Sequence, residues 1–491
     1  MRTKIYFGMF IIFAVVASCW AAKNFQGEDK IRIVFGGGFG GGLNPTNFKT
    51  LNAAYVSDLV FPPLIGSLDV KQYFPRIAES WEINEADTFL SFTLDSEVAF
   101  SNGDPLRCKD VKKSLEHSIS IRKQDQNFIE DFRRLKGYSN KNESIEGIQC
   151  SHPLKIEFHS QSTNTNLLEA LSNPELGIHK IEGSSYIGCG NYHIKLQNKD
   201  YALLERLKSK TLPDSYPKYI EYVGSDTHRI KKADVFVSYS QDMVPEAYRK
   251  FSQFEITWMA RLLYFYRHEQ SIFANELNRK ALQALFWQKN NMDSLIEKIG
   301  SGNFIPDPQP FLQLQPGRIN DEHVIDILQS GKKDIQNLIV ESKRRPIKFV
   351  HVGGSHCLKI LDHLKSLGLA IDDDHSRELD FESLDFEPAD IQCVSYSECL
   401  LKRNMIHYMT GDNLSPPFED LLSVQRGNNK MNKEELAKYL REISKVTLDK
   451  VPFIIVGRAP LVAYYNERKI RVRQFTNSAL GNSILDRFYI K

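Results

Sequence analysis

The order of apolar and polar positions predicts short strands and helices that follow one another along the chain. Apolar and polar residues alternate at 89–94 and again at 154–158, which is typical of strands with one face in solvent. Residues 108–119 carry apolar side chains at helical spacing and follow the turn signal at 101–105, so a helix is predicted there. A second helix is expected near 166–171. The first half of the chain therefore combines both element types.

The C-terminal half continues this mixture with longer helices. A helical region is predicted over residues 275–298, and the proline-rich segment 306–310 ends it because proline disfavours regular structure. Strands and helices alternate without strict regularity, which predicts an α/β fold rather than a β-sandwich or a helix bundle. The further expected elements are a strand at 347–352, a helix at 356–367 closed by Gly368, a helix at 434–446, and strands at 453–456 and 461–465.

A glycine-rich run follows the first predicted strand. Its spacing satisfies G-x-G-x-x-G, the pattern of a dinucleotide-binding turn, but that turn must lead directly into a helix. Pro45 disfavours helical backbone at Asn44, so the required helix does not follow. The run is therefore not a dinucleotide-binding turn, and we interpret the glycines of residues 36–42 as serving backbone flexibility or close approach.

The N-terminus has the pattern of a secretory leader. Basic residues precede an apolar run at 5–16, which is short for a membrane-spanning helix and suitable for a signal peptide. Residues 16–19 resemble the lipobox of bacterial lipoproteins, in which the cysteine, here Cys19, becomes the lipidated first residue. Two alternatives remain open: cleavage by the ordinary signal peptidase after Ala21 or Ala22, and retention of the segment as an N-terminal anchor.

Length and charge narrow the class of protein. At 491 residues the chain is too long for one simple core, so roughly two or three domains are expected. Loss of residues 1–18 would remove two of the 63 basic residues, Arg2 and Lys4, and none of the 61 acidic ones. The mature chain would then be formally neutral. Without a basic surface field, we do not expect nucleic-acid binding.

The cysteines other than Cys19 permit disulfides but do not specify them. An exported chain can hold disulfides, and this many cysteines admit many pairings. Cys393 and Cys399 are close enough in sequence for a local loop closure, although two buried free thiols fit equally well. No pairing follows from the sequence. The full set is Cys108, Cys150, Cys189, Cys357, Cys393 and Cys399.

Other residue clusters give little support for a metal centre or an enzyme. Segment 351–357 contains two histidines and a cysteine, but His363 lies seven residues beyond His356, and no H-E-x-x-H frame is present. Ser355 as a helix cap explains this segment more simply, and the same segment lacks the final glycine of G-x-S-x-G. The acidic run 372–374 is typical of a solvated loop. We therefore expect no catalytic residue, no metal and no cofactor.

Four stretches carry motifs in a fixed order. Residues 43–45 read L-N-P, 75–83 read P-R-I-A-E-S-W-E-I, 98–106 read V-A-F-S-N-G-D-P-L, and 188–192 read G-C-G-N-Y. Together they resemble the bacterial extracellular solute-binding proteins of family 5, the exported peptide- and nickel-type receptors of ABC importers. That family has L-D-P, P-x-L-A-E-S-W-E, V-x-F-H-D-G-x-P-L and G-T-G-P-Y at these places. Order and spacing agree over residues 31–200, and the rest of the chain matches more loosely.

The residues of these motifs are interpreted as structural. Gly103 supplies the positive φ of a turn with a rigid exit at the following proline. Trp81 is expected to be a core anchor rather than a ligand-stacking residue. Gly188 and Gly190 are expected to let the strand at 192–196 pack closely.

The resemblance implies an α/β fold of the periplasmic-binding-protein type II class, with two lobes, a hinge and an extra domain. In this class the chain crosses between the lobes more than once. The implied boundaries are a signal peptide at 1–18, a first segment of lobe I at 19–50, an extra domain inserted in lobe I at 51–183, a second segment of lobe I at 184–262, lobe II at 263–452, and a C-terminal return to lobe I at 453–491.

The resemblance also implies a function. It is that of an extracytoplasmic receptor that binds a peptide or a similar small polar solute between two closing lobes and delivers it to the permease subunits of an ABC importer. The protein is then expected to be a monomer on the periplasmic or extracytoplasmic face, held at the membrane through a lipid on Cys19. The alternative is an envelope lipoprotein of the same fold that acts as an interaction or signalling module without transport.

Candidate ligand-binding residues follow from the family's positions. Many peptide receptors of this family bind the amino group of the peptide with an aspartate near a W-x-x-D-Y run, and the corresponding stretch here, 389–399, lacks that run. Glu398 is the candidate substitute, and Tyr396 is a candidate for lining the cleft. The full candidate set is Gly38, Gly40, Asn44, Tyr396 and Glu398.

Overall fold

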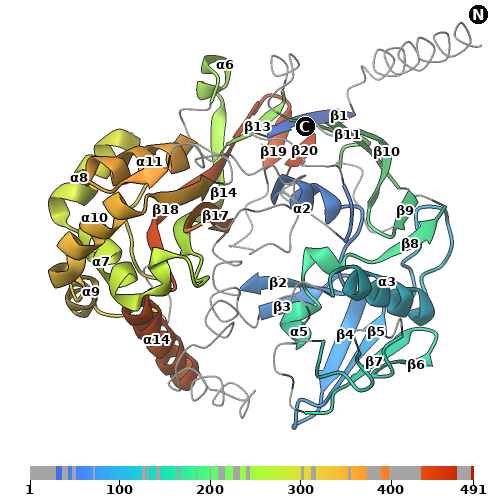
Figure 1. Ribbon diagram of the computed structural model, residues 1–491. Helices are drawn as coiled ribbons and strands as arrows, with labels where there is room; N and C mark the ends of the chain where they lie inside the picture. Colours follow the sequence, from blue (N-terminus) through green and yellow to red (C-terminus); the bar gives the residue numbers. More distant parts are fainter. Residues whose placement is uncertain are drawn as a thin grey trace, which may run out of the picture.

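The computed structural model resolves two bodies joined by long strands (Figure 1). No helix among the residues it describes is both long enough and apolar enough to cross a membrane. The described residues are 29–35, 43–46, 51–69, 72–123, 129, 132–139, 144–162, 164, 167–183, 185–198, 201–207, 216–224, 233–238, 244–299, 304–310, 317–351, 355–372, 389–397, 433–472 and 488–490.

A ten-stranded mixed sheet connects the two bodies, in the order β10-β11-β12-β1-β13-β18-β14-β17-β15-β16. β1 pairs in parallel with β12 and β13, β15 pairs in parallel with β16 and β17, and the remaining neighbours are antiparallel. The strands are β1 (Lys30–Phe35), β10 (Tyr192–Asn198), β11 (Tyr201–Arg206), β12 (Tyr219–Gly224), β13 (Val235–Ser238), β14 (Ser252–Phe265), β15 (Ile347–His351), β16 (Ile371–Asp372), β17 (Ile391–Ser397) and β18 (Phe453–Tyr465).

We call β1 and β10 to β13, with helix α2 (Leu51–Ser57), the first lobe. β1 lies between two parallel strands, and its last three residues, 33–35, are apolar and buried, as expected for a strand covered on both faces. Ile31, Ile33 and Phe35 enter one core, and Val34 enters a second core on the opposite face of the sheet.

A four-stranded domain adjoins the first lobe and has a core of its own, formed within residues 64–189 (Figure 1). Its antiparallel sheet has the order β4-β5-β7-β6, and helix α3 packs Val111, Leu115 and Ile119 against it, as the helical spacing predicts. The elements are β2 (Ile65–Asp69), β3 (Gln72–Pro75), β4 (Ala78–Ile83), β5 (Phe89–Leu94), α3 (Cys108–Ile121), β6 (Ile148–His152), β7 (Lys155–His159), α5 (Leu167–Ala170), η1 (Pro174–Leu176), β8 (His179–Glu182) and β9 (Ser185–Gly188).

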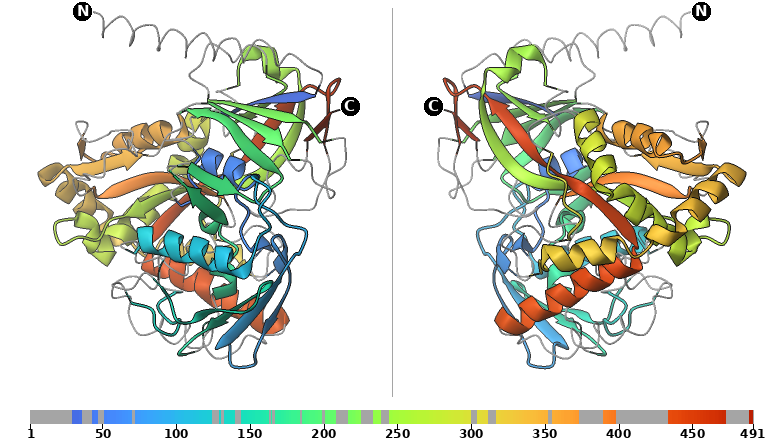
Figure 2. Two further views of the ribbon diagram at one scale, coloured as in Figure 1. Left: turned by 90° about the vertical axis from the view of Figure 1, so that its right-hand side faces the viewer. Right: turned by 90° about the vertical axis from the view of Figure 1, so that its left-hand side faces the viewer.

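We call β15 to β17 and the helices packed on them the second lobe. The helices are η4 (Ile272–Ala274), α7 (Glu276–Phe286), α8 (Lys289–Ile299), α9 (Asp321–Leu328), η5 (Lys332–Asp334), α10 (Ile335–Arg344), α11 (Ser355–Ser366) and α14 (Lys433–Lys450); elsewhere lie α6 (Glu246–Arg249), β19 (Ile470–Val472) and β20 (Phe488–Ile490). Figure 1 shows the helices of the second lobe on the left and the four-stranded domain on the right, and in the side views of Figure 2 helix α14 (red) extends from the group across the lower part of the molecule.

Several local predictions are confirmed. Gly103 has φ +93°, and a Cβ at Gly188 or Gly190 would overlap the backbone of residues 59 and 60. The predicted helix at 166–171 is the single turn α5. Trp81 packs against the core of the four-stranded domain beside Phe92, at 6.4 Å between ring centroids, and is only partly buried.

Two predicted element boundaries are wrong. The expected strands at 453–456 and 461–465 form one strand, β18, because β14 pairs with it along its whole length and keeps the intervening residues extended. The expected helix at 275–298 is two helices, α7 and α8, with Trp287 and Gln288 between them and neither glycine nor proline to mark the break.

The cysteine expectations also need correction. Cys393 is bonded to Cys357, so it neither closes a loop with Cys399 nor remains a free thiol. The second disulfide joins Cys108 to Cys150. Cys189 is a buried free thiol, and burial raises its pKa to about 12, so it stays protonated. Only tertiary packing brings the bonded cysteines together, because they are 36 and 42 residues apart in sequence.

Candidate functional site

The candidate site lies where β14 and β18 pass between the two lobes (Figure 1). At its C-terminal end β18 pairs with β13 of the first lobe, through residues 462–465. At its own C-terminal end β14 pairs with β17 of the second lobe, through residues 259–265. The two strands pair with each other throughout, and we call them the crossing strands.

The ladder between the crossing strands is irregular at two places. Its register shifts between Glu255 and Thr257 of β14, and again between Arg261 and Leu262. Such bulges bend a strand and increase its twist locally. Pro460 lies between the two shifts, opposite Trp258. Proline has no backbone N–H to donate to a neighbouring strand, so it is tolerated at a strand edge where no neighbouring strand requires that hydrogen bond.

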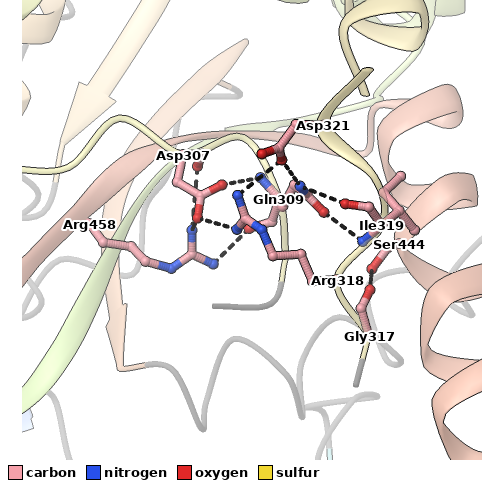
Figure 3. Close-up of polar contacts among 8 residues, drawn as sticks. All are labelled: Asp307, Gln309, Gly317, Arg318, Ile319, Asp321, Ser444 and Arg458. Carbon is pink, nitrogen blue, oxygen red and sulfur yellow. Dashed lines mark hydrogen bonds and ion pairs between the residues drawn. The ribbon is translucent and has the colours of Figure 1, made fainter. Parts of the chain in front are cut away.

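A buried arginine marks the second-lobe side of β18. The side chain of Arg458 is 1% exposed, and its guanidinium lies 3.1 Å from Oδ2 of Asp307 and donates to the carbonyl oxygen of Gln309 at 2.6 Å. The backbones of Arg458 and Ile305 also exchange hydrogen bonds in both directions, of 2.7 and 2.8 Å. The cation is therefore held by segment 304–310 of the second lobe (Figure 3).

The polar network extends beyond Arg458 into the helices. Arg318 donates to Asp307 at 2.7 Å. The side-chain amide of Gln309 donates to the backbone carbonyl of Ile319 and accepts from its backbone N–H. Gln309 also donates to Asp321, the first residue of α9, at 2.7 Å. Figure 3 shows these residues converging on segment 307–309. The segment is thus tied both to a crossing strand and to a helix.

A second buried arginine lies on β14. Arg261 is 3% exposed and donates through Nε to Nδ1 of His356, in the first turn of α11, at 3.4 Å. The His356 ring also meets that of Phe304 at 6.0 Å between centroids. Segment 351–357, the histidine- and cysteine-containing stretch in which we expect no metal, therefore contacts a crossing strand through His356. Cys357 is in a disulfide, and within the described part of the chain no group of three or more His, Cys, Asp or Glu residues is arranged to hold a metal ion.

The structure places two of the predicted ligand-binding residues. Asn44 forms a local turn, since its Oδ1 accepts hydrogen bonds from the backbone N–H and the hydroxyl of Thr46 at 2.9 and 2.8 Å. Tyr396 belongs to β17, and its backbone pairs with Ala260, which pairs in turn with Arg458. Asn44 thus lies near the first lobe and Tyr396 in the sheet of the second. Gly38, Gly40, Glu398 and the predicted lipidation residue Cys19 lie outside the described residues.

Sequence reasoning missed the two buried arginines. Each is the single charged residue in a long apolar strand segment, 453–465 for Arg458 and 256–265 for Arg261. A charge in such a segment must be paired if it is buried, so this pattern is the signal that could have identified them. Their partners, Asp307 and His356, could not be chosen from the sequence.

Comparisons with known proteins agree with this architecture. The family model described as "Bacterial extracellular solute-binding proteins, family 5 Middle" matches residues 72–316, about half of the chain. No curated protein matches. Among solved structures, OppA of Burkholderia pseudomallei is 12% identical with a TM-score of 0.73, covering 94% of this chain and 99% of its own.

Two further structures show the same fold. The oligopeptide-binding protein OppAIV of Borrelia burgdorferi is 13% identical, with a TM-score of 0.74 and coverage of 94% and 100% of the two chains. DppA of Helicobacter pylori, in complex with the peptide STSA, is 14% identical, with a TM-score of 0.71 and coverage of 94% and 98%. The chain has the type II periplasmic-binding-protein fold and belongs to the bacterial extracellular solute-binding proteins of family 5.

Proposed function

We propose that this protein is the extracytoplasmic receptor of an ABC importer, and that it binds a peptide or a similar small polar solute between its two lobes and delivers it to a membrane permease. The observation that carries the proposal is the pair of crossing strands, which join two separately packed lobes on the scaffold of this family. The receptor acts by binding and release, without covalent chemistry.

Closure of the two lobes supplies the mechanism. A solute that contacts both lobes binds the closed state better than the open one and shifts the population toward it. The permease then distinguishes loaded from empty receptor by shape. A decisive switch requires a difference in binding free energy of about 5.5 kcal/mol between the two states.

The proposed ligand contacts retain the sequence-based set. Gly38, Gly40 and Asn44 would contact the solute from the first lobe, and Tyr396 and Glu398 from the second. Asp307 is a poor receptor for a ligand ammonium group, because Arg318 and Arg458 already hold its carboxylate. Glu398 stays the proposed partner of that group, from its place in the sequence. The domain boundaries given above, a monomeric state and attachment through a lipid on Cys19 complete the proposal.

A thermal-shift screen tests the proposal. The mature protein is heated with di- to pentapeptides, and with a nickel–histidine complex in parallel because a structural neighbour, NikA of Staphylococcus aureus, was solved with Ni(L-His)2. A ligand at a hundred times its Kd should stabilise the fold by about 2.7 kcal/mol. The absence of any shift across the whole panel would contradict a receptor for these solutes.

Cell fractionation tests the lipid anchor. Replacement of Cys19 by alanine removes the thiol that would carry the lipid, so the variant should leave the membrane fraction for the soluble extracytoplasmic fraction. The wild-type protein and a Cys189→Ala variant, which loses only a buried thiol, should stay with the membrane. A Cys19→Ala protein that remains attached would show that the lipobox interpretation is wrong.

A further inference from the structure

We propose that Arg458 is a positioning residue that clamps segment 304–310 of the second lobe to crossing strand β18, and that the clamp confines bending during lobe closure to residues 459–461. The inference rests on the proposed function for the role of closure. The clamp itself is a property of the ligand-free protein and can be tested without any ligand.

The burial of a cation on β18 is the first observation. A guanidinium that is 1% exposed is stable only while its partners remain in place, and those partners are the Asp307 carboxylate and the Gln309 carbonyl. Separation of segment 304–310 from the strand would take these partners away from a buried charge. Strand residue 458 and this segment therefore move as one body.

The backbone beside Arg458 gives a second, independent observation. Ile305 and Arg458 form an isolated antiparallel bridge on the edge of β18 that faces away from β14. The adjacent Gly457 allows this approach, because a Cβ at that position would lie 2.5 Å from the ring of Phe304 and 2.6 Å from the carbonyl oxygen of Ile305. The segment is thus fitted to the strand by shape as well as by charge.

The partner of β18 on this edge changes between the lobes. Residues 462–465 pair with β13 of the first lobe, whereas Arg458 pairs with Ile305 of the second. Alternate residues of a strand present their backbone groups to the same edge, so Pro460 presents its donorless nitrogen to this edge between the two partners. On this edge of β18, residues 459–461 therefore lie between the part paired with the first lobe and the part paired with the second, and belong to neither pairing.

The opposite strand has a matching irregularity. The register shift in β14 between Glu255 and Thr257 faces residues 461 and 462 of β18, directly beside the unbound stretch. Bulged ladders bend more readily than regular ones because their hydrogen bonding is already interrupted. The other register shift, between Arg261 and Leu262, faces residues 455–457 of β18, where the bonds of Arg458 hold the strand to segment 304–310. The shift beside residues 459–461 is therefore the one without this support, and the Arg458 clamp marks its second-lobe limit.

The clamp is also anchored within the second lobe. Arg318 connects Asp307 to Asp321 at the start of α9, with distances of 2.7 and 3.2 Å. Ser444 of α14 donates to the carbonyl oxygen of Gly317 at 2.6 Å, next to Arg318 in sequence (Figure 3). Motion of α9 and α14 is thereby transmitted to β18 through one short segment.

Hydrogen–deuterium exchange on the ligand-free, full-length mature protein tests the clamp. Arg458→Met keeps the length of the side chain and removes its charge and donors, so peptides covering 304–310 and 453–458 should exchange at least about tenfold faster, the equivalent of 1.4 kcal/mol. Peptides covering 235–238 and 462–465 should keep wild-type rates. Unchanged exchange at 304–310 in folded Arg458→Met protein would overturn the proposal.

A matched control separates the clamp from the general cost of losing a buried arginine. Arg76→Met breaks the ion pair of Arg76 with the buried Asp58, which directly follows α2 of the first lobe. It should leave exchange at 304–310 unchanged. Equal effects of Arg76→Met and Arg458→Met at that segment would also overturn the proposal. If Arg458→Met does not fold, Gly457→Ala replaces it, since it should displace the same segment without altering any charge.

The second readout measures closure with the most stabilising peptide of the thermal-shift panel. Arg458→Met should raise koff about tenfold with little change in kon, because the second lobe no longer closes as one body. Arg458→Lys, which keeps the charge but not the fork, should recover part of the loss. Unchanged koff in Arg458→Met with faster exchange at 304–310 would overturn the link to closure. If no peptide binds at all, the proposed function fails, and the exchange experiment still decides the clamp.

Discussion

The four-stranded domain and the second lobe each have a hydrophobic core and a disulfide, but the residues of the second core are spread over a longer part of the chain. The core of the four-stranded domain is formed within residues 64–189, whereas that of the second lobe includes residues from 263 to 456. Each contains one disulfide between a helix and a strand, Cys108–Cys150 in the former and Cys357–Cys393 in the latter.

The second lobe depends on the crossing strands in a way that the four-stranded domain does not. Leu263 and Phe265 of β14, and Ile454 and Val456 of β18, enter the core of the second lobe. No residue of either strand belongs to the core cluster of the four-stranded domain as described. Damage inside the second lobe should therefore reach the hinge and ligand binding, while equal damage in the four-stranded domain should remain local.

The largest expected contrast comes from matched cavities. Phe158→Ala in the four-stranded domain and Phe349→Ala in the second lobe each remove a fully buried ring and should each cost about 3–5 kcal/mol of unfolding free energy. Only Phe349→Ala should also weaken binding of a stabilising peptide, because β15 supports β17 beside β14. Urea unfolding and calorimetric titration measure the two effects, with Phe→Leu at each site as the milder control. Equal losses of affinity would remove the contrast.

The disulfides give a smaller contrast of the same kind. Replacement of either cysteine pair by alanine should cost about 2–4 kcal/mol, and the similar separations of 42 and 36 residues predict similar entropic contributions. Loss of Cys357–Cys393 should in addition speed exchange in β17, which that bond ties to α11. Mass-spectrometric exchange compares both double variants. If β17 exchanges at the wild-type rate in the variant, this disulfide stabilises the protein only by restricting the unfolded chain and does not hold β17 in the folded state.

Acid should weaken both regions through one buried histidine each. Burial lowers the pKa of His179 to about 4, with His117 adding to the effect, and burial followed by the charge of Lys298 lowers the pKa of His363 to about 4. The unfolded chain takes up these protons near pH 6.5, so the unfolding free energy should fall between pH 6.5 and 4, by up to about 1.4 kcal/mol per pH unit for each histidine.

Substitutions should separate the two histidines. Neither ring nitrogen of His363 has a hydrogen-bond partner among the described residues, so His363→Leu should remove its acid sensitivity at little cost near neutral pH. His179 donates through Nδ1 to the carbonyl oxygen of Gly177 at 2.9 Å, so His179→Leu should remove the acid sensitivity but destabilise at every pH. Urea melts between pH 4 and 8 measure both. Acid sensitivity retained in both variants would assign it to other groups.

Local signals explain what could be predicted. The strand at 89–94, the helix beginning at Cys108 and the positive φ of Gly103 each depend on residues close in sequence, and each is confirmed. They fall in the region where the family motifs are dense. The candidate ligand-binding residues are less well determined, because Asn44 completes a local turn and Tyr396 is placed through its backbone alone.

The sequence alone determined the fold class, the family and the local elements of the four-stranded domain. Periodicity, turn residues and ordered motifs each depend on residues that are close to one another in the sequence. Tertiary structure alone decided that β18 is continuous, that Cys357 bonds Cys393, and that Arg458 holds a segment about 150 residues before it. These pairings join distant residues whose types fit many partners, and only packing of the complete lobes selects one partner for each.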